Sequence, residues 1–136
     1  MRIEKVTFKN LNSLAGTWSI DFTNERYRED GIFEITGPTG AGKSTVLDAI
    51  CLALYGQTPR LATISKSTNE IMTRQTGDCF AEVVFSTGKG RYRSHWSQRH
   101  ARNKPEGALQ PAKQELVNLD TNEMVNLKKG IADKIN

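Results

Sequence analysis

A glycine-rich octapeptide, Gly37-Pro38-Thr39-Gly40-Ala41-Gly42-Lys43-Ser44, restricts the folds open to this chain more than any other feature. It satisfies the eight-position pattern of a phosphate-binding loop. The apolar run 31–36 before it is typical of a buried strand, and the small and apolar run 43–55 after it predicts a buried helix that ends at Gly56. Because strand, glycine-rich loop and helix come in the order that such a loop requires, the sequence predicts an α/β fold of the P-loop NTPase class.

The same octapeptide predicts how a nucleotide would be held. A triphosphate carries several negative charges, and main-chain N–H groups can point at them where glycines leave the backbone unobstructed. The helix opening at Lys43 adds unpaired N–H groups and the positive end of its dipole. We expect Lys43 to reach the β- and γ-phosphates, Ser44 to ligate Mg²⁺ and Thr45 to contact the α-phosphate. The simpler alternative is a glycine-rich turn that only caps a helix, and the strand-to-helix context argues against it.

Size and composition indicate one globular unit. The chain has 136 residues, of which 37% are apolar and 25% charged. Its N-terminus has no apolar core that would make it a secretion signal, and no apolar run is long enough to span a membrane. Neither Cys51 nor Cys79 has the spacing of a metal ligand, and we expect a reducing cytoplasm and no membrane.

Alternating apolar residues predict β-structure on both sides of the octapeptide. Strands are expected around 6–8 and 17–22, with Trp18, Ile20 and Phe22 on the buried side and a turn over 10–16. The runs 80–86 and 91–97 flank a glycine-containing turn and predict a hairpin. A loop is expected over 103–111, then a strand over 115–119 with a turn at 120–122, and a short lysine-rich helix at the end.

The segment 58–78 is polar and its role stays open. Ser67 and Glu70 have the spacing of a capping box, which predicts a short helix through Ile71 and Met72.

The elements that nucleotide hydrolysis needs besides the loop are not convincing in this sequence. Hydrolysis requires a metal-binding carboxylate after a second apolar strand and a group that positions water. The run 116–120 ends in Asp120, but Asn118 interrupts it, which favours an ordinary strand and turn. The run 103–106 resembles a guanine-reading motif only superficially, since Glu106 stands where that motif has Asp. We therefore expect this chain alone to bind a nucleotide without turning it over.

Several stretches together resemble one family. They are Phe8-Lys9-Asn10-Leu11-Asn12-Ser13-Leu14, Ile35 to Thr45, Leu47-Asp48-Ala49-Ile50-Cys51-Leu52-Ala53-Leu54-Tyr55-Gly56, and the shorter Thr58-Pro59-Arg60-Leu61, Met72-Thr73-Arg74 and Trp96-Ser97-Gln98. Across nearly the whole chain, the sequence is similar to the amino-terminal part of SbcC, the ATPase subunit family of the bacterial SbcCD nucleases and a relative of the SMC proteins.

The resemblance implies an ABC/SMC-type head in which an antiparallel β portion leans on the P-loop strand and helix. It implies ATP and Mg²⁺ as cofactors, and DNA, an SbcD-type nuclease subunit and a second head as partners in DNA repair and recombination. It also implies that residues 1–136 form an incomplete head, because the family's glutamine loop, signature motif, catalytic Glu and coiled coil would follow later. In related heads the loop after the first strand approaches the base or ribose, a position that Asn12 and Ser13 match.

The second half of the chain carries a local excess of positive charge. Seven basic residues and one acidic residue lie between Ser86 and Gln114. If 91–99 is extended, Arg91, Arg93, His95 and Arg99 share one face, and Tyr92 and Trp96 the other. Such a face suits the DNA phosphate backbone, and the arginines are the predicted contacts; a solvated face without a ligand is the alternative. The two histidines are interpreted as surface polar groups, not metal ligands.

These observations favour the ATP-binding portion of a DNA-processing ATPase. Two other interpretations stay open: another P-loop enzyme, such as a transporter ATPase or small-molecule kinase, or a DNA-binding module whose P-loop is vestigial. A signature motif and a coiled coil would separate the first from an SbcC-type head, and nucleotide titration would test the second.

Overall fold

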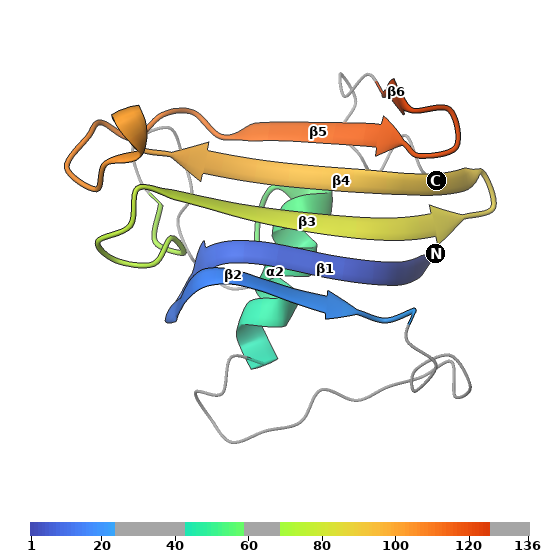
Figure 1. The fold of residues 1–136 in the computed structure, drawn as a ribbon, viewed down its shortest axis with the longest axis horizontal. Helices are drawn as coiled ribbons and strands as arrows, with labels where there is room; N and C mark the ends of the chain where they lie inside the picture. Colours follow the sequence, from blue (N-terminus) through green and yellow to red (C-terminus); the bar gives the residue numbers. More distant parts are fainter. Residues whose placement is uncertain (24–42, 59–68, 126–136) are drawn as a thin grey trace.

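The computed structural model describes residues 1–23, 43–58 and 69–125 (Figure 1). Two predicted elements lie outside these residues, namely the strand over 31–36 and the lysine-rich helix near the C-terminus.

The described strands form one antiparallel sheet of six strands in the order β2-β1-β3-β4-β5-β6 (Figure 1). The strands are β1 Arg2–Leu11, β2 Leu14–Asp21, β3 Asp78–Thr87, β4 Gly90–Arg99, β5 Lys113–Asn118 and β6 Glu123–Met124. All neighbouring pairs are antiparallel. Strand β3 pairs with β1 on one side and with β4 on the other, so the hairpin β3–β4 extends the sheet that the hairpin β1–β2 begins. The predicted antiparallel portion is confirmed.

The predicted hairpin around residues 87–90 is confirmed and is longer than expected. Strands β3 and β4 pair in regular register from Asp78 opposite Arg99 to Thr87 opposite Gly90. Burial alternates along both strands, as the period-two pattern predicted. The hairpin thus has an inner, apolar face and an outer, polar face. The predicted turn at 120–122 is also confirmed, and there the Asn118 side chain accepts hydrogen bonds from the N–H groups of Asp120 and Thr121.

One helix, α2 (Lys43–Tyr55), crosses the inner face of the sheet behind β1, β3 and β4 (Figure 1). Its bounds agree with the prediction, and Gly56 ends it with φ +71° while its N–H binds the Leu52 carbonyl at 2.9 Å. The predicted buried helix is not buried on every side. Leu47 and Tyr55 are 54% and 55% exposed, because the sheet covers one side of α2 only.

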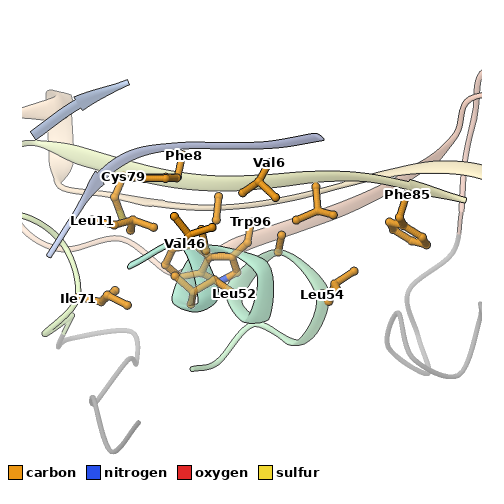
Figure 2. Packing of buried hydrophobic residues seen from close by; sticks show 14 of the residues in the cluster. Val6, Phe8, Leu11, Val46, Leu52, Leu54, Ile71, Cys79, Phe85 and Trp96 are labelled. Carbon is orange, nitrogen blue, oxygen red and sulfur yellow. The ribbon is translucent and has the colours of Figure 1, made fainter. Parts of the chain in front are cut away.

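The core lies between α2 and the sheet (Figure 2). Trp96 of β4 packs against the helix near Leu52, and Phe8 of β1 belongs to the same core, all at most 2% exposed. Burial of each such side chain contributes about 1.5–3 kcal/mol. The Ala53 carbonyl accepts hydrogen bonds from the side chains of Ser94 and Gln114, so polar contacts also attach the end of α2 to β4 and β5.

Two expectations are wrong, namely the burial of Trp18 and the short helix through Ile71 and Met72. Trp18 is 48% exposed although its strand partner Phe8 is buried, because β2 is the edge strand of the described sheet and α2 packs on β1, β3 and β4. Ile71 and Met72 are not helical; Met72 forms an antiparallel bridge with Leu11 at the end of β1. The Asn69 side chain accepts the N–H groups of Ile71 and Met72, which holds this segment as a turn against the sheet.

Candidate nucleotide site and the outer face of the sheet

The predicted phosphate-binding loop ends at the first turn of α2. Its residues Gly37, Pro38, Thr39, Gly40, Ala41 and Gly42 lie outside the described residues, and of Lys43 only the backbone, as the first residue of α2, is described. Ser44 is exposed in that first turn, whereas Thr45 is only 3% exposed. The helix therefore begins where the loop predicts, with an exposed hydroxyl followed by a buried one.

A hydrogen-bonded triad joins this helix to the β1–β2 turn. The Asn12 amide donates to Thr45 Oγ1 and to Asp48 Oδ2, both at 3.0 Å. Asn12 has φ +52°, a left-handed conformation that asparagine tolerates in turns. The structure thus brings together two of the predicted site residues, Asn12 and Thr45, while Ser13 beside them is exposed.

Asp48 is a site residue that the sequence reasoning missed. It is 1% exposed although it carries an ionisable side chain, and such groups are buried in proteins only when they are paired. The available signal was its position as the only acidic residue in an otherwise small or apolar helix. Both amide hydrogens of Asn12 are directed at α2, so the Asn12 side chain positions the helix relative to the turn.

The segment whose role had stayed open supports the same turn from the other side. The Asn12 N–H binds the Ile71 carbonyl at 2.7 Å, and the Thr73 N–H binds the Asn10 carbonyl at 2.9 Å. The Asn69 side chain in turn donates a hydrogen bond of 2.7 Å to Gln98 Oε1, which attaches the segment 69–73 to β4. The β1–β2 turn is therefore held between α2 and the segment 69–73.

The outer face of β4 has the predicted arrangement. Arg91, Arg93 and Arg99 are exposed and His95 is half-buried, whereas Tyr92 and Trp96 are 7% and 2% exposed on the inner face. The period-two prediction is confirmed for each of these side chains. DNA contact by the arginines stays a prediction.

Carboxylates from β1 and β3 offset part of the positive charge on this face. Arg91 Nε lies 3.0 Å from Glu4 Oε2 of β1, and Arg93 Nε lies 3.2 Å from Glu82 Oε1 of β3. The pKa of Glu82 is lowered, chiefly by the His95 imidazole facing its carboxylate at 3.9 Å and then by the charges of Arg93 and Lys5. The pattern of one strand could not show these pairs, because the carboxylates come from other strands.

The two ends of β4 differ in whether their positive side chains form ion pairs. Among the described residues, Arg99 and the neighbouring Lys113 of β5 have no carboxylate at ion-pair distance. Asp78, opposite Arg99 on β3, is bound by Lys9 at 3.0 Å. Arg99 and Lys113 thus leave positive charge without an ion-pair partner at this end of the outer face, as far as the described residues show.

His100 and the buried Cys79 each have a hydrogen-bond partner in the structure. His100 Nδ1 forms a hydrogen bond of 2.8 Å with the Gly107 carbonyl in the β4–β5 connection. Burial raises the pKa of the Cys79 thiol to about 12 and also raises that of Cys51. Over residues 1–23, 43–58 and 69–125 no three His, Cys, Asp or Glu side chains are grouped so that they could hold a metal ion. In the same residues no helix has the length and apolar character of a membrane span.

Comparisons with known proteins agree with this geometry. The chain is 46% identical, over 95% of its length, to the SbcC component of the SbcCD nuclease from Pseudomonas aeruginosa. It is 38% identical over 92% of its length to the protein of the same name from Rhodobacter capsulatus. It is 34% identical over 78% of its length to a probable DNA double-strand break repair Rad50 ATPase from Aquifex aeolicus. The chain spans 12%, 11% and 10% of the length of these relatives, respectively.

A solved structure shows the same fold. The SMC head domain from Thermotoga maritima superposes with a TM-score of 0.55 and 19% sequence identity, covering 98% of this chain and 42% of that one. This likeness confirms the predicted ABC/SMC-type head fold, and the sequence relatives confirm the resemblance to SbcC. The family described as AAA domain (AAA_23) matches residues 5–136, and the chain therefore belongs to that family.

Proposed function

We propose that this chain is the ATP-binding part of the head of an SbcC-type ATPase, which acts with a nuclease subunit on DNA ends in repair and recombination. The observation that carries the proposal is the meeting of a complete P-loop pattern with the first turn of α2, in a chain 46% identical to an SbcC protein. The proposed action with a nuclease on DNA ends is based on the relatives' names, which mention a nuclease and DNA double-strand break repair.

In the proposed site, the main-chain N–H groups that the loop 37–42 carries at every position except Pro38 would surround the phosphates, and Lys43 would neutralise their charge. The Ser44 hydroxyl, exposed on the first turn of α2, would be one ligand of Mg²⁺, which keeps mostly water and phosphate oxygens around it. Thr45, which follows Ser44 in the helix and is bound by Asn12, is the proposed contact of the α-phosphate. Mg²⁺ would neutralise charge on the triphosphate.

We also propose that the chain binds ATP without hydrolysing it. The run 116–120 lies in β5 and the turn after it, and Asp120 Oδ2 accepts the Arg91 N–H at 3.1 Å. Because β5 is antiparallel to both of its neighbours, Asp120 does not follow a parallel strand. This chain matches only 12% and 11% of the length of two SbcC relatives, and we propose that the metal-binding carboxylate and the water-positioning group needed for hydrolysis belong to the remainder of such a protein. A second head and an SbcD-type nuclease subunit are the proposed partners, and the cytoplasm is the proposed location.

Titration of the chain with ATP, with and without Mg²⁺, tests the proposal. A charge-assisted contact contributes about 1.5–3 kcal/mol, so Lys43→Ala should weaken ATP binding by roughly tenfold to a hundredfold. Lys113→Ala, which removes the same charge from the outer face of the sheet, should leave ATP affinity unchanged. If Lys43→Ala retained full affinity, the P-loop assignment would be rejected. Measurable ATP turnover by the chain would contradict only the second proposal.

A further inference from the structure

A cavity of about 490 Å³ opens on the outer face where β3, β4 and β5 meet the β4–β5 connection. It lies at the end of β4 that carries Arg99, away from the paired Arg91 and Arg93. Its size is within the ~300–1,000 Å³ typical of small-ligand sites. A single nucleotide unit fits that range, whereas a base-paired duplex does not enter such a cavity.

Two rings lie side by side in this cavity. The rings of Phe80 on β3 and His95 on β4 stack with centroids 5.1 Å apart and planes 27° from parallel. Both side chains are half-buried on the outer face, and Pro111 and Ala112 of the connection add apolar lining. An aromatic platform on a sheet face beside an apolar wall is suited to a flat, weakly polar ring.

The same cavity is lined by unpaired positive charge. Arg99 and Lys113 line it, and within the described ranges neither side chain has a carboxylate at ion-pair distance. The exposed side chain of Asn103 and the half-buried Gln110 add polar groups at its edge. The acidic lining residue, Asp78, is already paired with Lys9 at 3.0 Å. The cavity thus combines a stacking surface with cations free to bind a phosphate.

From this combination we propose that the cavity binds one unpaired nucleotide at the end of a DNA strand, with its base on Phe80 and His95 and its phosphate at Arg99 and Lys113. The inference rests on the proposed function, which supplies DNA as the substrate, and adds that the unpaired part of an end is recognised. Stacking on an aromatic ring accepts any base, so the recognition is independent of sequence. Blunt duplex ends, whose bases remain stacked, would bind only through their backbone.

The test measures binding of three fluorescent DNAs to the complete protein: a single strand, a duplex with an unpaired overhang and a blunt duplex. The wild type should bind the first two more tightly than the third. Phe80→Leu should weaken overhang binding about fivefold to a hundredfold, and leave blunt-duplex binding unchanged. Phe80→Tyr, which keeps the ring, should restore the wild-type value. A fluorescent base analogue in the overhang should be quenched by the wild type and not by Phe80→Leu.

Charge variants complete the test. Arg99→Gln and Lys113→Gln should each reduce the salt dependence of single-strand binding, by a slope of about 0.7 for each phosphate that is no longer neutralised. Lys104→Gln removes an exposed cation from the same connection outside the cavity and should leave the slope unchanged. Equal affinity for the overhang and blunt DNAs, or equal overhang binding by Phe80→Leu and the wild type, would overturn the inference while leaving ATP and duplex binding intact. If Phe80→Leu lost binding of the nuclease subunit and kept its binding of DNA, the inference would be overturned and the cavity would be a protein-docking surface.

Discussion

Asn12 and Asp48 lie 36 positions apart in the sequence and are joined by a hydrogen bond of 3.0 Å between the Asn12 amide and the Asp48 carboxyl. The bond links the turn after the first strand to the second turn of the helix that follows the phosphate-binding loop. Asp48 is 1% exposed and Thr45, the second acceptor, is 3% exposed, so water cannot readily replace the amide. The triad therefore sets where the beginning of α2 stands relative to the sheet.

Replacing Asn12 tests whether this residue positions the helix or contacts the nucleotide. Asn12→Ala removes two hydrogen bonds to the buried Thr45 and Asp48 and should lower the free energy of unfolding by about 1–3 kcal/mol. If Asn12 positions α2, the variant should weaken binding of ATP and of inorganic tripolyphosphate by the same factor in titration calorimetry. A contact with base or ribose would instead weaken ATP binding alone. Thr17→Ala, exposed in the same β1–β2 hairpin, is the matched control and should change neither quantity.

Reversing two charges on the outer face tests the predicted DNA contact. Arg91→Glu with Arg93→Glu places each new carboxylate beside Glu4 or Glu82 and turns two ion pairs into repulsive pairs. Duplex DNA affinity should fall, and its dependence on salt should flatten by a slope of about 0.9 for each phosphate that is no longer neutralised. Glu82→Gln, which frees Arg93, should have the opposite effect on affinity. Unchanged duplex binding by the double variant in fluorescence anisotropy at several salt concentrations would remove Arg91 and Arg93 from the interface.

The Cys79 thiol should make the stability of the chain fall at high pH. Burial raises its pKa in the folded state to about 12 from a reference value of 9.0, so the unfolded chain loses this proton first. The stability that the neutral thiol contributes is complete below pH 9 and is lost as the pH rises toward 12, by up to about 1.4 kcal/mol per pH unit. Urea unfolding of the wild type and Cys79→Ala between pH 7 and 11 measures the difference. Parallel pH profiles would show that Cys79 does not titrate in this way.

Gly77 should tolerate no side chain. A Cβ atom at this position would meet the backbone carbonyl of Asn103 and the N–H of Lys104, neither of which can rotate away. Gly77→Ala should therefore destabilise the fold by about 1–3 kcal/mol, as overpacking does. Gly88→Ala in the β3–β4 turn meets nothing within 4 Å and serves as the control. If the two variants had the same midpoint of denaturation, the close contact between residue 77 and the β4–β5 connection would be wrong.

Much of the fold was predictable where the signal is local. The period of two along β3 and β4 and the apolar helix closed by Gly56 were identified to within a few residues of their ends. The short helix through Ile71 and Met72 was wrong because its capping signal competes with a bridge to Leu11, about sixty residues earlier. Trp18 was predicted to be buried because the alternation of apolar and polar residues shows which side chains share one face of a strand. The alternation does not show whether another element covers that face.

The sequence by itself determined the phosphate-binding loop, the helix after it and the side of β4 on which each arginine lies, because these depend on residue type and on spacing along one segment. Only the tertiary structure decided that Glu4 neutralises Arg91, that Asn12 holds Thr45 and Asp48, and that Phe80 and His95 stack beside an unpaired Arg99. These contacts join residues from different strands or from a strand and a helix. Their formation depends on sheet order and register, which the burial of the whole inner face selects.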